Sequence, residues 1–135
     1  MSTTLIHRFS FLERIVHWVV GVTFVVLLGT GLAFAYPSLF WLTTLLGGGA
    51  AARVLHPQIG ALFGVGILFM FGLWVRDMFL DGQDRAWLGA IKHYATHDRE
   101  KVPPAGKYNA GQKLFFWVQS LLGIVFVVTG GVLWF

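Results

Sequence analysis

Three long apolar runs constrain the fold of this 135-residue chain more than any other feature. They cover roughly residues 15–36, 56–76 and 113–135, and each approaches the ~20 helical residues that cross a bilayer. Inside lipid, backbone polar groups must be paired within the protein, and a helix pairs them within its own segment. We therefore expect an all-α integral membrane bundle, with three transmembrane helices in a single domain over residues 1–135.

Composition agrees with this class. Hydrophobic residues make up 56% of the chain and charged residues 12%, which is too little polar surface to cover a water-soluble domain. The sequence contains no cysteine, so disulfides and thiolate ligands are excluded, and any metal must be held by histidine, carboxylate or thioether groups. The +4 net charge flanks the spans without forming a patch for nucleic acid, and we expect membrane lipid as the surroundings.

The placement of positive charge predicts the topology. Seven of the ten Lys and Arg residues lie between Arg76 and Lys113, whereas the first interspan loop holds Arg53 alone. Two spans separate the N-terminus from the 77–112 loop, so both lie on one side, which the positive-inside rule makes cytoplasmic. We expect a multi-pass protein of the cytoplasmic (inner) membrane.

Two stretches, 14–21 and 53–60, repeat the pattern Arg-x-x-His-x-x-x-Gly at the start of apolar runs. On a helix, each arginine lies one turn toward the surface from its histidine, and each glycine lies one turn deeper. This pattern suits a b-type haem, with histidine on the iron, glycine leaving room for the macrocycle and arginine pairing with propionates. The alternative is two interfacial histidines with snorkelling arginines and packing glycines. The residues concerned are Arg14, His17, Gly21, Arg53, His56 and Gly60.

Local signals predict where helices begin. Ser10 and Glu13 have the spacing of a capping box, which places a helix start just before Arg14. Pro57 is expected in the first turn of the second span. Residues 39–46 form an apolar segment too short to span, which we expect to lie half-buried at the outer surface.

The long loop predicts one amphipathic helix. Its apolar residues follow helical spacing between charges, as expected for a helix on the inner surface or against a partner: Trp87, Leu88, Ile91 and Tyr94. His93 and His97 are one turn apart, but an exposed loop without a third ligand favours solvated histidines over a metal site.

Asn109 and Gln112 lie three residues apart at the start of the third span, so they share one face of a helix. Their amides both donate and accept hydrogen bonds, as the carbonyls of a quinone and the hydroxyls of its reduced form require. The alternative is that Asn109 caps the helix and Gln112 supports the cap, and the two roles are compatible.

These residues resemble those of a known family. Along its whole length the chain is similar to the gamma, or cytochrome b, subunit of membrane-bound respiratory formate dehydrogenase. The similarity rests on Arg8-Phe9-Ser10 with Glu13-Arg14 and His17-Trp18, on Arg53 with His56-Pro57, and on residues 103–113, which read Pro-Pro-Ala-Gly-Lys-Tyr-Asn-Ala-Gly-Gln-Lys. The last run is the most specific.

The resemblance implies a diheme cytochrome b. His17 would supply an axial ligand to the haem near the cytoplasm, and His56 one to the haem near the outer face. Asn109 and Gln112 would line a pocket for menaquinone or ubiquinone. A molybdenum or tungsten catalytic subunit would oxidise formate, and an iron–sulfur subunit would pass the electrons on. This subunit would transfer electrons and reduce quinone without formate chemistry of its own.

One departure from the family concerns the haem ligands. Two bis-histidine haems need four histidines, and the third span contains none. We expect the natural subunit to continue past Phe135 into a fourth span that supplies them. Met70 is an alternative partner for His17, although a gap-filling role is more typical of methionine. A haem-free membrane anchor, or the cytochrome b subunit of a thiosulfate reductase or hydrogenase, is the alternative function.

Overall fold

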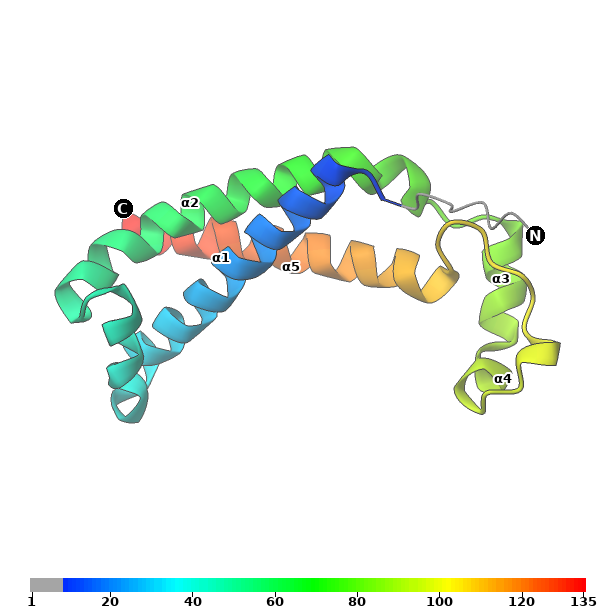
Figure 1. Cartoon of the computed structure of the whole chain (residues 1–135), viewed down its shortest axis with the longest axis horizontal. Coiled ribbons are helices and arrows are strands. Elements are labelled where there is room, and N and C mark those ends of the chain that lie inside the picture. The colour runs from blue at the N-terminus through cyan, green and yellow to red at the C-terminus, as the bar shows by residue number, and fades with distance from the viewer. Residues whose placement is uncertain (1–8) are drawn as a thin grey trace, which may run out of the picture. The chain divides into compact units, whose positions relative to one another are not determined.

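The computed structural model describes residues 9–135 and consists of helices joined by loops (Figure 1). Its three long helices are α1 (Phe11–Ala35), α2 (Gly49–Trp74) and α5 (Ala110–Trp134). A helix of 25 residues extends about 37 Å, enough to cross a hydrocarbon core of about 30 Å. The predicted all-α class with three membrane-spanning helices is confirmed. Arg8, which contributes to the family resemblance, lies outside the described residues.

The first helix begins where its capping box predicts. Ser10 Oγ accepts a hydrogen bond from the Glu13 backbone N–H at 3.2 Å, and Glu13 Oε2 accepts one from the Ser10 N–H at 2.6 Å. The cap satisfies two donors that the first turn leaves without helical partners, so α1 starts at Phe11, before the apolar run itself.

The predicted position of Pro57 in a first helical turn is wrong. α2 already begins at Gly49, so Pro57 lies inside the helix. The start moves upstream because Gly47 and Gly48, with φ of 87° and 100°, end the preceding 3-10 helix η1 (Pro37–Leu46) in a left-handed turn. The alanines at 50–52 that follow have the highest helix propensity, and membrane helices tolerate an internal proline.

The described residues divide into two compact units. The first unit comprises residues 9–70 and 122–135. Its contacts show that α1 and α2 run antiparallel, because later residues of α1 meet earlier residues of α2. The pairs are Val20 with Gly66, Phe24 with Phe63, Leu27 with Gly60, and Thr30 with His56.

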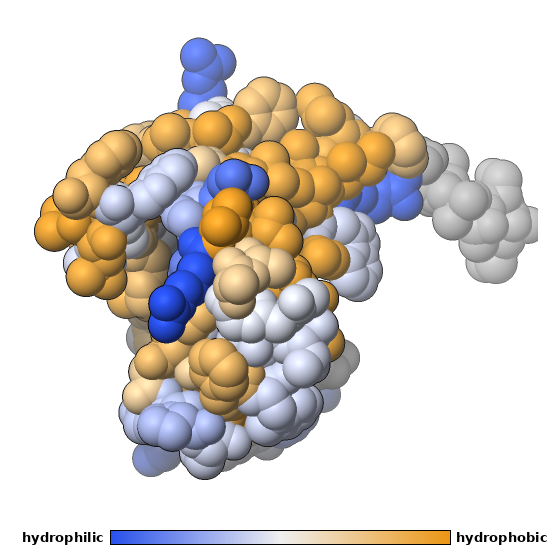
Figure 2. Space-filling view, turned by 90° about the vertical axis from the view of Figure 1, so that its left-hand side faces the viewer, coloured by the Kyte–Doolittle hydropathy of each residue, from blue (hydrophilic) through white to orange (hydrophobic). Residues whose placement is uncertain are grey.

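Glycines allow the helices of this unit to approach closely. A Cβ atom added at Gly66 would lie 2.7 Å from Cγ2 of Val20 on α1, and one at Gly123 of α5 would lie 3.1 Å from Cγ2 of Ile67 on α2. Small residues at helix contacts increase van der Waals packing in membranes, where apolar burial gives little driving force. Large apolar side chains instead face outward, as the orange surface in Figure 2 shows and as expected for contact with lipid.

The second described unit comprises residues 71–121. It contains η2 (Val75–Met78), α3 (Gly82–Gly89), α4 (Ile91–Ala95), η3 (Arg99–Lys101) and the first part of α5. The single amphipathic helix predicted here is wrong, because the chain breaks into α3 and α4 at Ala90, directly after the weak helix former Gly89. Trp87 is buried within its own chain, with its ring centroid 5.0 Å from that of Tyr94.

Candidate functional site

His56 of α2 forms a hydrogen bond with a threonine of α1. Nδ1 of its imidazole ring lies 2.6 Å from Oγ1 of Thr30, which is fully buried. The two residues are 26 positions apart in the sequence, and the antiparallel packing of α1 and α2 brings them together. The same threonine hydroxyl is 2.8 Å from the backbone carbonyl oxygen of Val26 in its own helix.

Two further residues of α1 contact the His56 ring. The ring of Phe34 meets it edge-on, with 5.4 Å between centroids and an interplanar angle of 67°. A Cβ atom added at Gly31 would lie 3.8 Å from Cε1 of His56, so the helix backbone itself approaches the ring. One stretch of α1 thus fixes the position of the imidazole.

An apolar hollow of about 510 Å³ is bordered by Phe34, the residue that contacts the His56 ring. It is shared between α1, η1 and α2, and its lining combines four apolar side chains with one guanidinium: Ala33, Phe34, Pro37, Phe40 and Arg53. Phe34 links the hollow to the His56 ring, and Arg53 precedes His56 by one helical turn. An apolar hollow with one cation at its edge suits a flat apolar group that carries acidic substituents.

The first histidine motif, residues 14–21, lies at a different position along the axis of α1 from the residues that contact His56. His17 and Arg14 are exposed on α1, and a Cβ atom added at Gly21 would have no neighbour within 4 Å. His17 precedes Thr30, the partner of His56, by 13 residues on α1, which corresponds to about 20 Å along the axis. The two histidines are therefore held apart, as expected for two separate sites.

The glycine of the second motif packs against protein. A Cβ atom added at Gly60 would lie 3.9 Å from Cδ2 of Leu27, at ordinary van der Waals distance. Of the two predicted glycines, Gly21 therefore borders open space and Gly60 borders α1.

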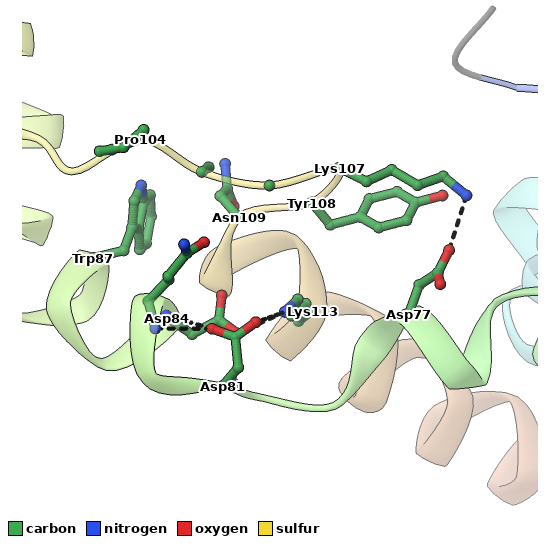
Figure 3. A pocket seen from close by; sticks show the side chains of 12 residues that line it. Asp77, Asp81, Asp84, Trp87, Pro104, Lys107, Tyr108, Asn109 and Lys113 are labelled. Carbon is green, nitrogen blue, oxygen red and sulfur yellow. Dashed lines mark hydrogen bonds and ion pairs between the residues drawn. The ribbon is translucent and has the colours of Figure 1, made fainter.

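The second unit contains a smaller cavity of about 150 Å³ next to the start of α5 (Figure 3). Its lining is mostly polar and comes from η2, α3, the 104–109 segment and α5. The residues are Asp77, Asp81, Gln83, Asp84, Trp87, Pro104, Ala105, Gly106, Lys107, Tyr108, Asn109 and Lys113.

Asn109 and Gln112 form a reciprocal helix cap. Asn109 Oδ1 accepts the Gln112 backbone N–H at 2.9 Å, and Gln112 Oε1 accepts the Asn109 N–H at 3.1 Å. The capping role predicted for this pair is confirmed. The cap uses the two side-chain oxygens and not the amide nitrogens, and Asn109 also lines the cavity. Capping and ligand binding are therefore compatible at Asn109.

Lys113 is the principal residue that sequence reasoning missed. Its ammonium is buried and donates to Asp84 Oδ2 at 2.6 Å, to Asp81 Oδ2 at 3.3 Å and to the Phe79 carbonyl oxygen at 3.1 Å. Asp81 and Asp84 also form the capping box of α3, and the hydrogen bond from the Asp84 backbone N–H is the main cause that lowers the pKa of Asp81. Two sequence signals could have predicted this buried ion pair: the Asp-x-x-Asp spacing of residues 81–84, and a lone cation at the start of an apolar run.

Comparisons with known proteins give one family and several relatives. The profile of the family described as prokaryotic cytochrome b561 matches residues 8–135. The chain is 38% identical over 135 residues to the nitrate-inducible formate dehydrogenase cytochrome b556(Fdn) subunit of Escherichia coli K12, covering 98% of this chain and 61% of that protein. It is 32% identical to the formate dehydrogenase cytochrome b556 subunit of Haemophilus influenzae, covering 90% of this chain and 51% of that protein. The chain thus spans between half and three fifths of the length of these relatives.

Proposed function

Because this chain belongs to the prokaryotic cytochrome b561 family, we propose that it is the membrane cytochrome b subunit of a formate dehydrogenase. In this function it carries electrons across the bilayer and delivers them to quinone. The observation that carries the proposal is the His56 site, where a positioned imidazole, an apolar hollow and an arginine come together. A cytochrome b binds haem b, whose iron accepts and releases one electron at a time.

The residues around His56 fit one such haem. His56 would ligate the iron, the apolar side chains of the hollow would contact the macrocycle, and the Arg53 guanidinium would pair with a propionate. The donor set suits iron in a porphyrin, since imidazole is a common axial ligand and the sequence has no cysteine. Gly60, one turn deeper than His56, faces Leu27 of α1.

His17 is the proposed ligand of a second haem b. Arg14 precedes it by one turn, and its exposed guanidinium would be free to pair with a propionate. Gly21 follows by one turn and leaves open space beside the helix for a macrocycle. The axial separation of about 20 Å between the two histidine levels supports one haem near each membrane face.

Quinone reduction is proposed at the start of α5. The amide nitrogens of Asn109 and Gln112, which the helix cap does not use, would donate hydrogen bonds to a carbonyl oxygen of menaquinone or ubiquinone. Two electrons and two protons convert the quinone into quinol. The electrons come from the partner subunits, and the protons from the cytoplasm.

The topology and partners complete the proposal. The distribution of positive charge supports a topology with the N-terminus and residues 77–112 at the cytoplasmic side of the inner membrane and His56 near the outer side. An iron–sulfur subunit would donate electrons there after a molybdenum or tungsten subunit has oxidised formate. Moving each electron inward stores about 2.3 kcal/mol per 100 mV of membrane potential.

The direct test is the haem content of the complex purified from its native membrane. We expect two haems b for each copy of this chain, with a reduced visible spectrum typical of low-spin b-type cytochromes. Extraction and quantification of the haem give the number independently of the spectrum. A complex without b-type absorption would overturn the proposal in favour of a haem-free anchor.

Replacing Asn109 with alanine is expected to slow quinone reduction at least tenfold, while costing only about 1 kcal/mol of stability for the lost cap. Ser10→Ala is the matched control, because Ser10 forms the same type of capping box on α1. Activity with a quinone analogue and thermal unfolding are measured for both variants, and for Gln112→Ala, for which we expect a smaller effect in the same direction. If Asn109→Ala and Ser10→Ala lose stability and activity equally, Asn109 acts only as a cap.

A further inference from the structure

We infer that Thr30 is a positioning residue that fixes the tautomer of His56, so that Nε2 of the imidazole is the atom available to iron. This inference rests on the proposed haem at His56. It assigns a role to a threonine that belongs to neither histidine motif.

The hydrogen bonds of Thr30 give the direction of the contact. Its hydroxyl carries one hydrogen, and the helix already provides acceptors for it, the carbonyl oxygens of Val26 at 2.8 Å and Leu27 at 3.3 Å. Oγ1 then has lone pairs left and no second hydrogen for His56. With the hydroxyl hydrogen directed to a helix carbonyl, the 2.6 Å contact becomes a hydrogen bond that Nδ1–H of His56 donates to Oγ1 of Thr30.

The consequence for His56 follows from imidazole chemistry. A neutral imidazole carries one N–H, so a proton held on Nδ1 leaves the lone pair on Nε2. A partner that accepts from the distal N–H fixes the ring orientation and makes a ligating histidine more basic. A more basic ligand favours ferric over ferrous iron, so the Thr30 hydrogen bond lowers the midpoint potential of the haem that His56 binds.

Burial strengthens this contact. Thr30 is 0% exposed, so water does not compete for its hydroxyl. Phe34 and the backbone at Gly31 limit how far the ring can turn away from Oγ1. Thr30 and these neighbours therefore hold the imidazole in one orientation.

Thr23 provides a matched control on the same helix. It is also buried, and its hydroxyl donates to the carbonyl oxygens of Val19 at 2.8 Å and Val20 at 3.0 Å, but no histidine contact is found for it among the described residues. Thr23→Val and Thr30→Val remove the same helical hydrogen bond, and only the second removes the bond to His56.

The test measures haem content and the midpoint potential of each haem in the purified complex. Thr30→Val is expected to weaken haem binding about tenfold or more. If oxidised haem loses tenfold more affinity than reduced haem, the potential of that haem rises by about 59 mV. Thr30→Ser, which keeps the hydroxyl, should restore both values, and Thr23→Val should match the wild type.

Three outcomes would overturn the inference. They are an unchanged potential and haem content in Thr30→Val, equal changes in Thr23→Val and Thr30→Val, and no rescue by Thr30→Ser. Failure of the underlying proposal is distinguishable, because the wild-type complex would then lack b-type haem, or a His56→Ala complex would keep the haem content of the wild type.

Discussion

Replacing His56 with alanine is expected to remove one of the two proposed haems and to abolish formate-driven quinone reduction. The methyl group cannot ligate iron, and an apolar hollow with one arginine does not hold haem firmly without that bond. Haem extraction, the reduced visible spectrum and formate-dependent reduction of a quinone analogue would be measured on the purified complex.

The matching His17→Ala variant should fail differently. It too should lose one haem, but formate should still reduce the haem that remains, because the proposed topology puts that haem on the side where electrons arrive. In His56→Ala the remaining haem should stay oxidised when formate is added. Stopped-flow absorbance after mixing with formate separates the two cases and tests the proposed order of electron transfer.

His93→Ala is the control for both variants, because His93 lies in α4, outside the membrane-spanning helices. Its haem content and activity should equal those of the wild type. Full haem content in His56→Ala or in His17→Ala would contradict the corresponding ligand assignment.

Replacing Lys113 with methionine is expected to destabilise the second unit by about 3–5 kcal/mol, the usual cost of leaving one member of a buried ion pair without its partner. Asp84, which is 4% exposed, would lose its cationic partner in a site that water scarcely reaches. The effect is measured by thermal unfolding of the detergent-solubilised complex, with the rate of proteolysis in the 77–112 loop as the readout.

Two further variants isolate the buried charge. Lys107→Met removes an exposed ion pair, 2.8 Å from Asp77, and should cost no more than about 1 kcal/mol. Asp84→Asn combined with Lys113→Met removes both buried charges and should recover much of the lost stability. If the double variant is as unstable as Lys113→Met alone, packing of the lysine stem is responsible instead of charge.

Local sequence patterns were sufficient wherever short-range physics decides the structure. Hydropathy and length identified three spanning helices, because the requirement to pair backbone groups in lipid does not depend on tertiary detail. The capping boxes at Ser10 and Asn109 were equally readable, since each is made by residues three apart. The start of α2 is not readable in this way, because apolar residues alone do not mark a helix end and the alanines at 50–52 extend the helix upstream of Pro57.

The sequence by itself determined the class of protein, the helix caps and the two histidine motifs, all of which depend on residues within a few turns of one another. Only the tertiary structure decided which residues meet those motifs. Thr30 and Phe34 reach His56 through antiparallel packing of α1 on α2, and Lys113 reaches Asp84 across 29 residues. Such contacts depend on which faces of two helices pack together, and a sequence pattern fixes the face of one helix without giving the residue opposite it.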